Sequence, residues 1–408
     1  MFKAIAIAVA ITTLTVVAWF RGWLPVQSKS SSTQAQDQLP TTLAGGQGAG
    51  IATGPKAGEP AQPVPKAEPR SGLGLFQLGD YEAAIPRLTE DLARDKGSAA
   101  HWAALATSYE KTGQIQESLG AWNRLAANCP RAAERPAALA RLFAAAEGAA
   151  RVDAAMRLLR EHPESTEAGA NVVAIADLAE KNGRPLDAWE ALSLAVQLGV
   201  GNEGALIPRC AAWADALAFS PKDVPEIATI HLVKQGDLVV TIAKKYKVDQ
   251  GVVARVNRVQ NGAIKVGQRL KVLTLKPTIE VSIKKLWLRL YYDGKHGKYL
   301  ARQYAVCTGA LDVSPTPIGT FTVSTKLINP EWTRAGHAAV PFGHPDNPLG
   351  TRWMGFAEPG YTSFGIHGTI KPETIGTHAS NGCVRMKNDT VEELFDLAPS
   401  GTAILIHD

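Results

Sequence analysis

The sequence has few cysteines, little excess charge and only one long apolar run. Four of its 408 residues are cysteine, which excludes a disulfide-rich scaffold and a protein with several zinc sites. The 43 basic and 38 acidic residues leave a net charge of +5, too small for a protein devoted to binding nucleic acid. An apolar fraction of 45% is that of a folded globular protein, and a chain of this length is expected to form several domains.

The apolar run, residues 4–20, contains seventeen residues without a charge. This length is at the short end of what a membrane-spanning helix needs, and Trp19, Arg21 and Trp23 suit a membrane interface. No clear cleavage site follows, so residues 1–26 are predicted to be an uncleaved signal anchor, with a removed signal peptide as the alternative. Either one places the rest of the chain outside the cytoplasm, in the cell envelope (periplasm or wall), and an anchor would hold it to the cytoplasmic membrane.

Residues 27–70 are rich in Ser, Gln, Thr, Gly and Pro and poor in large apolar side chains. Such a segment cannot bury enough apolar surface to offset its ordering entropy, so we expect a disordered linker. As a flexible coil it would span roughly 35–40 Å, enough to hold the following domains away from a membrane.

Residues 71–220 are rich in Ala and Leu, with apolar residues at helical spacing. Glycines recur at intervals of 34, 35 and 35 residues, at Gly79, Gly113, Gly148 and Gly183. Together with the segment WAALATSY at 102–109, this pattern resembles the tetratricopeptide repeat, a pair of helices. The resemblance implies an α-helical solenoid that serves as a spacer or binds a protein partner. An unrelated helical bundle is the alternative.

Residues 229–274 differ from the rest in charge and pattern. Nine Lys or Arg and two Asp fall between residues 229 and 275. The order of strand, Gly236-Asp237 turn, two helices, Gly267 turn and strand resembles a LysM module, a small α+β fold of βααβ type. The resemblance implies binding to the N-acetylglucosamine-containing glycan of peptidoglycan or chitin, which the positive charge would assist. A solvated lysine face without a partner is the alternative explanation of the charge.

Residues 278–408 predict a mainly-β domain with one helix. Residues 280–292 alternate apolar and polar side chains as a strand does, and Asp293-Gly294 marks a hairpin turn. Further strands are predicted at 299–308, 319–328 and 403–407. Asp389 and Glu392 are expected to form a capping box at the start of the helix.

Three short segments of this region carry candidate chemistry: SPTPIGTF at 314–321, FGIHGT at 364–369 and SNGCVRM at 380–386. Cys383 lies sixteen residues after His367, an arrangement that suggests a cysteine nucleophile with a histidine partner. The thiolate is the attacking species, and a neighbouring imidazole can create it near neutral pH. Gly382 leaves room for backbone N–H groups to approach a developing oxyanion.

The residues alone leave other interpretations open for Cys383. It could be a small buried apolar residue, or form a disulfide with Cys307. A zinc site with His367 and His378 is a third alternative, although no Cys-x-x-Cys or His-x-x-x-His spacing supports it.

Together the three segments resemble the catalytic domain of the L,D-transpeptidases of the YkuD type. Its signature is an Ile-His-Gly-Thr strand followed by Ser-His-Gly-Cys-x-Arg, and an Asn-Pro-Leu-Gly segment is present at 347–350. The resemblance implies an enzyme of peptidoglycan that needs no metal or organic cofactor. It would form 3→3 cross-links between stem peptides through a thioester of Cys383, with His367 as proton donor and acceptor. An L,D-carboxypeptidase using the same site and a non-catalytic peptidoglycan-binding scaffold are the alternatives.

The same resemblance assigns supporting roles. The Gly368 carbonyl would orient the imidazole, a task that a third group performs in related triads. Backbone amides from Asn381 to Cys383 would form the oxyanion hole, Gly382 among them, and the Ser380 hydroxyl would brace the loop.

Two positions leave a question about function. Arg385 would face a substrate carboxylate or make an internal ion pair. Asn381 stands where the family usually has histidine, and we expect this position to contribute mainly its backbone N–H. If the usual imidazole takes part in proton transfer instead, the substitution puts activity in doubt.

Overall fold

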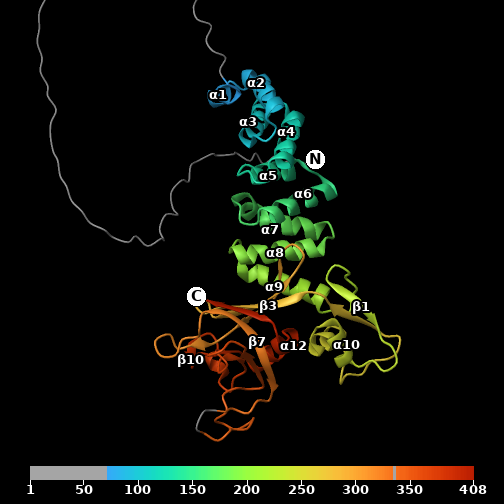
Figure 1. Cartoon of the computed structure of the whole chain (residues 1–408), viewed down its shortest axis with the longest axis vertical. Coiled ribbons are helices and arrows are strands. Elements are labelled where there is room, and N and C mark those ends of the chain that lie inside the picture. The colour runs from blue at the N-terminus through green and yellow to red at the C-terminus, as the bar shows by residue number, and fades with distance from the viewer. Residues whose placement is uncertain (1–70, 334–336) are drawn as a thin grey trace, which may run out of the picture. The chain divides into compact units, whose positions relative to one another are not determined.

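The computed structural model describes residues 71–333 and 337–408 (Figure 1). The predictions for residues 1–26 and 27–70, a membrane segment and a linker, therefore lie outside the described residues. Within the described ranges, no helix is long and apolar enough to cross a membrane. Three regions follow one another along the chain: helices, a small α+β module and a β-rich domain.

The helical region is a series of short helices in which each packs against the next along the chain. Their bounds are α1 Gly72–Gln77, α2 Tyr81–Arg94, α3 Ala99–Lys111, α4 Ile115–Asn128, α5 Arg135–Ala145, α6 Gly148–Glu161, α7 Thr166–Lys181, α8 Pro185–Leu198 and α9 Glu203–Trp213, which continues into the π-helix Ala214–Ala218. Buried Ala and Leu side chains line the faces that meet. The prediction of a helical region is confirmed; its assignment to the tetratricopeptide repeat stays a prediction.

Three of the four periodic glycines lie between the end of one helix and the start of the next, whereas Gly148 is the first residue of α6. Gly79, Gly113 and Gly183 each follow the last residue of a helical turn and have φ values of +79°, +80° and +67°. A residue in the left-handed backbone conformation ends the helix at this point, and glycine adopts that conformation without the strain that a Cβ atom brings. The 34- and 35-residue spacing therefore records where one helix stops and the chain reverses into the next.

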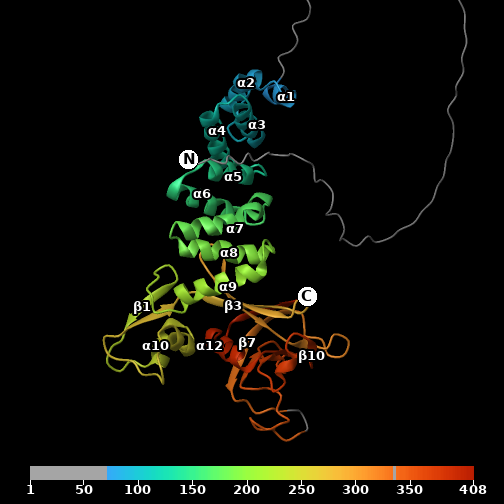
Figure 2. The same cartoon turned by 180° about the vertical axis from the view of Figure 1, so that it is seen from behind.

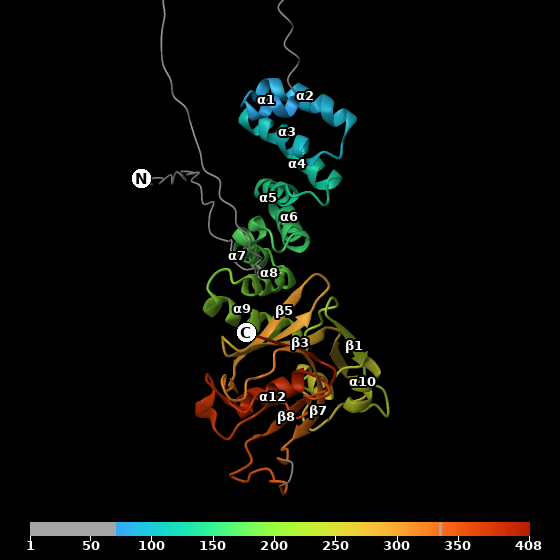
Figure 3. The same cartoon turned by 60° about the vertical axis from the view of Figure 1, so that its left-hand side comes forward.

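Helices α8 and α9 pack against strand β5, Lys298–Ala305, of the β-rich domain (Figure 3). Trp189 donates from Nε1 to the Leu300 carbonyl at 2.8 Å, and its ring stacks on Tyr299 with the centroids 4.6 Å apart. The Ser193 hydroxyl accepts the Leu300 N–H at 2.8 Å. These fully buried contacts join the last helices to the sheet.

The α+β module contains β1 Ala228–Leu232, α10 Val239–Tyr246, α11 Gln250–Val256 and β2 Arg269–Leu273, and β1 and β2 pair antiparallel. Its own core includes Ile242, Val253 and Leu270. The Asn257 side chain accepts the Lys271 N–H at 2.7 Å and donates to the Lys271 carbonyl at 2.8 Å, which fixes the end of α11 to β2. The predicted βααβ order is confirmed.

Charged side chains join this module to both neighbouring regions. Lys326 of the β-rich domain pairs with Asp249 at 2.7 Å, and Arg255 pairs with Asp396 at 3.2 Å. The buried ammonium of Lys271 donates to the Leu217 and Ser220 carbonyls at the end of the helical region. Apolar side chains of the module, Val252, Val256 and Leu273, also belong to the large core that it shares with its neighbours.

The β-rich domain contains one eight-stranded sheet in the order β11-β9-β8-β7-β12-β3-β4-β5. Figure 2 labels β3 and β7 of this sheet and the neighbouring helix α12. The remaining strands are β3 Lys276–Ser282, β4 Trp287–Asp293, β7 Gly319–Ile328, β8 Arg352–Phe356, β9 Gly365–His367, β11 Val384–Arg385 and β12 Ala403–His407. A separate parallel pair joins β6 Thr308–Gly309 to β10 His378–Ser380. The helices here are a 3-10 turn, Pro372–Thr374, and α12, Asn388–Leu397.

Two local predictions for this domain are wrong. Residues 280–292 form parts of two strands, β3 and β4, because the chain reverses at Ile283–Leu286, where Leu286 has a φ of +54°. No capping box forms on α12: its N-cap is Lys387, without a side-chain hydrogen bond to the helix. Asp389 instead accepts the N–H of Thr390 at 2.8 Å. The predicted strands at 319–328 and 403–407 are confirmed.

Candidate active site

Two adjacent parallel strands bring the candidate nucleophile and base together. β9 ends at His367, β11 begins just after Cys383, and His367 lies opposite Arg385 in their pairing. Because alternate residues of a strand share a face, Cys383 and Arg385 project to the same side of the sheet as His367. All three line one cavity of about 430 Å³. A histidine and a cysteine sixteen residues apart in sequence therefore open into the same space.

The imidazole of His367 is buried and held in one orientation. Its Nδ1 lies 2.6 Å from the Gly368 carbonyl, and because a carbonyl can only accept, Nδ1 carries the proton and Nε2 is left as the acceptor. Burial lowers the pKa of His367 to about 4; the Gly368 carbonyl opposes this shift, and the positive charge of Arg385 adds to it. The ring also stacks on Trp353 with the centroids 5.7 Å apart.

The Cys383 thiol is partly exposed to the cavity. Its Sγ donates to the Ser363 carbonyl at 3.8 Å. Burial raises the pKa of the Cys383 thiol, while the Gly365 backbone and the Arg385 charge lower it. Thiol and imidazole are therefore both neutral near pH 7, so the thiol must lose its proton as it attacks.

The loop before Cys383 is held by Ser380. The buried Ser380 hydroxyl donates to the Cys383 carbonyl at 2.6 Å and accepts the Gly382 N–H at 3.1 Å. Gly382 has a φ of +100°, and a Cβ atom there would lie 2.6 Å from the Phe364 ring. The two hydrogen bonds of Ser380 are the contacts expected of a side chain that braces the loop. Because the Gly382 N–H is already used, the amides of Asn381 and Cys383 remain as candidates for the oxyanion hole.

Arg385 lines the cavity without a charged partner. Its Nε is buried and has no hydrogen-bond partner, and no acidic side chain among the described residues pairs with it. The internal ion pair considered for Arg385 is therefore not present in the described part of the chain. Its charge instead faces the space that holds Cys383 and His367, as its effect on both pKa values shows.

The other interpretations of Cys383 find no support in the described residues. All four cysteines are free, and Cys307 is buried with its backbone paired to Arg385. No group of His, Cys, Asp and Glu side chains in the described ranges could hold a metal ion. His378 contacts the Thr308 hydroxyl through Nδ1 at 2.7 Å.

Asn388 is a residue near the site that sequence reasoning missed. Its Oδ1 accepts the N–H of Thr369 at 3.0 Å and of Thr351 at 3.3 Å. A Cβ atom on Gly368 would lie 2.2 Å from this oxygen, so Asn388 packs directly on the residue whose carbonyl orients His367. At the start of an acidic helix, an asparagine is expected to cap the helix, and the sequence gives no signal for this contact.

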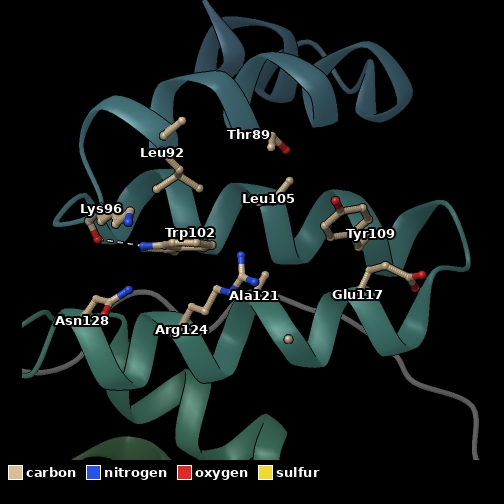
Figure 4. Close-up of a pocket in the computed structure, with 12 residues that line it drawn as sticks. Thr89, Leu92, Lys96, Trp102, Leu105, Tyr109, Glu117, Ala121, Arg124 and Asn128 are labelled. Carbon is tan, nitrogen blue, oxygen red and sulfur yellow. Dashed lines mark hydrogen bonds between the residues drawn. The ribbon is translucent and has the colours of Figure 1, made fainter.

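A second cavity, of about 660 Å³, lies in the helical region between α2, α3 and α4 (Figure 4). Leu92, Leu105 and Trp102 form its apolar part, and Trp102 donates from Nε1 to the Lys96 carbonyl at 2.9 Å. Lys96 and Arg124 lie toward the Trp102 end, and Glu117 lies at the other. Its described lining contains no cysteine or histidine, unlike the cavity that holds Cys383 and His367.

Comparison with known proteins bears on two regions of the chain. Residues 276–406 match the L,D-transpeptidase catalytic domain family (YkuD), and residues 231–273 match the LysM domain. The chain therefore contains a YkuD-type L,D-transpeptidase catalytic domain and a LysM domain.

Individual proteins are similar to parts of the chain. YqjB of Bacillus subtilis (strain 168), which is named as an L,D-transpeptidase, is 46% identical over 107 residues, 26% of this chain and 58% of that protein. YkuD of the same strain, also named as an L,D-transpeptidase, is 28% identical over 183 residues, 43% of this chain and 98% of that protein. Among solved structures, an L,D-transpeptidase from Mycobacterium smegmatis overlaps with a TM-score of 0.26 and 18% identity, over 35% of this chain and 64% of that one. The chain thus spans little more than half of YqjB.

Proposed function

We propose that this protein is a peptidoglycan L,D-transpeptidase that forms 3→3 cross-links between stem peptides through a thioester of Cys383. The observation that carries the proposal is the pairing of β9 with β11, which places His367, with Nδ1 held by Gly368, and Cys383 on one cavity. A neutral imidazole whose Nε2 carries no proton is the acceptor that a thiol nucleophile needs.

The first step forms the thioester. The Cys383 sulfur attacks the carbonyl of the third, diamino-acid residue of a tetrapeptide stem, and its proton passes to Nε2 of His367. The amides of Asn381 and Cys383 stabilise the oxyanion, and Arg385 binds a carboxylate of the stem. The carbon–nitrogen bond then breaks, and the proton moves from His367 to the departing amine of D-alanine.

The second step resolves the thioester. The side-chain amine of a neighbouring stem attacks the carbonyl, one of its protons passes through His367 to the Cys383 sulfur, and an amide bond replaces the thioester. If water attacks instead, the product is a trimmed stem, and the enzyme acts as an L,D-carboxypeptidase. A wall-linked protein is a second kind of amine acceptor that this chemistry permits.

The other regions would place this site on its substrate. The LysM domain is proposed to bind the peptidoglycan glycan, and the N-terminal segment to hold or send the chain outside the cytoplasm. For the helical region we propose a protein partner bound along the Trp102 cavity. Lys96 and Arg124 at one end favour an acidic peptide segment there.

Mass spectrometry of the purified protein incubated with disaccharide-tetrapeptide tests the proposal. A cross-linked dimer is the expected product. A trimmed monomer would establish the carboxypeptidase, and unchanged substrate without any acyl-enzyme adduct would leave only a peptidoglycan-binding scaffold.

Replacing Asn381 with histidine tests the backbone role of this position. Asn381 is exposed at the cavity and supplies its backbone to the loop, so the rate of acyl-enzyme formation in Asn381→His is expected to stay within about threefold of the parent, since no proton path is changed. Stopped-flow measurement with a β-lactam of the carbapenem class provides the rate. A gain of a hundredfold or more would show that the imidazole usual in the family does take part in proton transfer.

A further inference from the structure

The first residue of α12, Asn388, joins two segments that come from different strands of the sheet. Its Oδ1 accepts the N–H of Thr369, beyond the end of β9, at 3.0 Å, and the N–H of Thr351, just before β8, at 3.3 Å. Because both partners are donors, the oxygen and not the nitrogen of this amide faces them. One side-chain atom therefore holds the two segments together.

The space around this oxygen is filled by backbone. A Cβ atom on either Gly368 or Gly350 would lie 2.2 Å from Oδ1 of Asn388. A Cβ atom on Gly350 would also lie 2.5 Å from the Thr369 nitrogen and 2.8 Å from the Gly368 carbonyl carbon. Glycine at both positions lets the two backbones and the amide group meet this closely. The Asn388 oxygen therefore has little freedom to move relative to the peptide unit that follows Gly368.

That peptide unit also orients the catalytic imidazole. The Gly368 carbonyl and the Thr369 N–H belong to one planar trans peptide, in which they point in opposite directions. The carbonyl accepts from Nδ1 of His367 at 2.6 Å, and the N–H donates to Asn388. Rotation of the peptide plane would weaken both hydrogen bonds at once. His367 on one side of the plane and Asn388 on the other therefore keep it in a single orientation.

We infer that Asn388 is a positioning residue that selects the tautomer of His367 able to accept the thiol proton. The inference rests on the proposed transpeptidase function and concerns the base of its first step. With the Gly368 carbonyl in place, the proton of the neutral imidazole stays on Nδ1, and Nε2 can accept. If the peptide unit turns, Nδ1 loses its acceptor, and the tautomer with its proton on Nε2 becomes populated. Asn388 is not among the described residues that line the cavity, so it acts through Gly368.

The tautomer of His367 can be measured directly in the full chain. After labelling with ¹⁵N-histidine, two-bond ¹H–¹⁵N correlation spectra near pH 7 distinguish the two neutral forms, and His367→Gln identifies the signals of His367. We expect the Nδ1–H form alone in the parent, and roughly a quarter or more of the Nε2–H form in Asn388→Ala.

The same variant should separate catalysis from binding. In stopped-flow measurements with a carbapenem, the acylation rate of Asn388→Ala is expected to fall about tenfold or more, because a misplaced base transfers the proton poorly. The dissociation constant of the initial non-covalent complex should change less than about twofold, since Asn388 lies outside the described lining of the cavity.

Two variants at the start of the same helix separate positioning from general damage. Asn388→Asp keeps an acceptor oxygen and should restore the Nδ1–H form and an acylation rate within about threefold of the parent. Its negative charge, separated from the imidazole by one peptide unit, should also raise the pKa of His367 by about half a unit or more in the same spectra. Asp389→Ala removes a side chain that accepts the Thr390 N–H within the helix, and should match the parent in tautomer and rate.

Three results are decisive. A folded Asn388→Ala protein in which His367 keeps the parent tautomer overturns the inference, whatever its acylation rate. An Asn388→Asp protein with the parent pKa of His367 also overturns it, and this measurement decides if the alanine variant does not fold. Failure of the parent to acylate contradicts the proposed function instead, because the tautomer and the pKa are measured without substrate.

Discussion

Replacing Cys383 with alanine is expected to abolish acyl-enzyme formation completely. The hydroxyls among the described lining residues belong to Thr333, Thr362 and Ser363. A hydroxyl without its own activating base is a far weaker nucleophile than a thiolate. Removing the nucleophile of a covalent mechanism removes both half-reactions. Intact-protein mass spectrometry after incubation with a tetrapeptide or a carbapenem should show one adduct per chain in the parent and none in Cys383→Ala.

The chain supplies a matched control for this experiment. Cys129 lies in the helical region, where its thiol donates to the Gly97 carbonyl at 3.3 Å, and burial raises its pKa. Cys129→Ala should acylate at the parent rate within about twofold. An adduct that persists in Cys383→Ala and disappears in Cys129→Ala would place the reactive sulfur outside the catalytic domain, and the proposed function would fail.

The sequence predicted the parts of this site that depend on local pattern. His367 and Cys383 were identifiable because each has a glycine next to it, Gly368 and Gly382, and a glycine beside a reactive group marks a close backbone approach. The strands at 319–328 and 403–407 were identifiable because each falls on one continuous segment. What the sequence pattern could not supply was the parallel pairing of β9 with β11, which joins residues separated by an irregular segment.

The remaining errors have two different causes. Lys284-Lys285 interrupts the alternation of the run at 280–292 where the chain turns between β3 and β4, and the prediction treated the two strands as one. Asn388 resembles a helix-capping residue by position, but its Oδ1 is used by the amides of Thr351 and Thr369. The partners of Asn388 lie elsewhere in the chain, where single-sequence reasoning has no signal for them.

The pH dependence of acylation is expected to follow the protonation of the His367 imidazole. Its imidazole must be neutral to accept the thiol proton, and burial sets its pKa at about 4. The acid limb of the acylation rate should therefore lie near pH 4 rather than near the ordinary histidine value of about 6.5. His367→Gln should lower the rate on the order of a thousandfold, as loss of a general base does, and His378→Gln, which alters a histidine that does not line the cavity, should retain the parent profile.

The pH dependence of folding stability provides a second measurement of the His367 pKa. The His367 pKa is lower in the folded protein than its ordinary value of 6.5, so between pH 6.5 and 4 the unfolded chain binds more protons, and stability falls as the pH falls. A shift of this size corresponds to roughly 3 kcal/mol across that window. Urea unfolding of His367→Gln should show a shallower loss of stability below pH 6.5 than the parent does. Two results together would contradict this account: a parallel loss of stability in the parent and the variant, and an acid limb of acylation near pH 6.5. They would mean that His367 is solvated and charged at mildly acidic pH. The buried neutral base that the first step requires would then not exist.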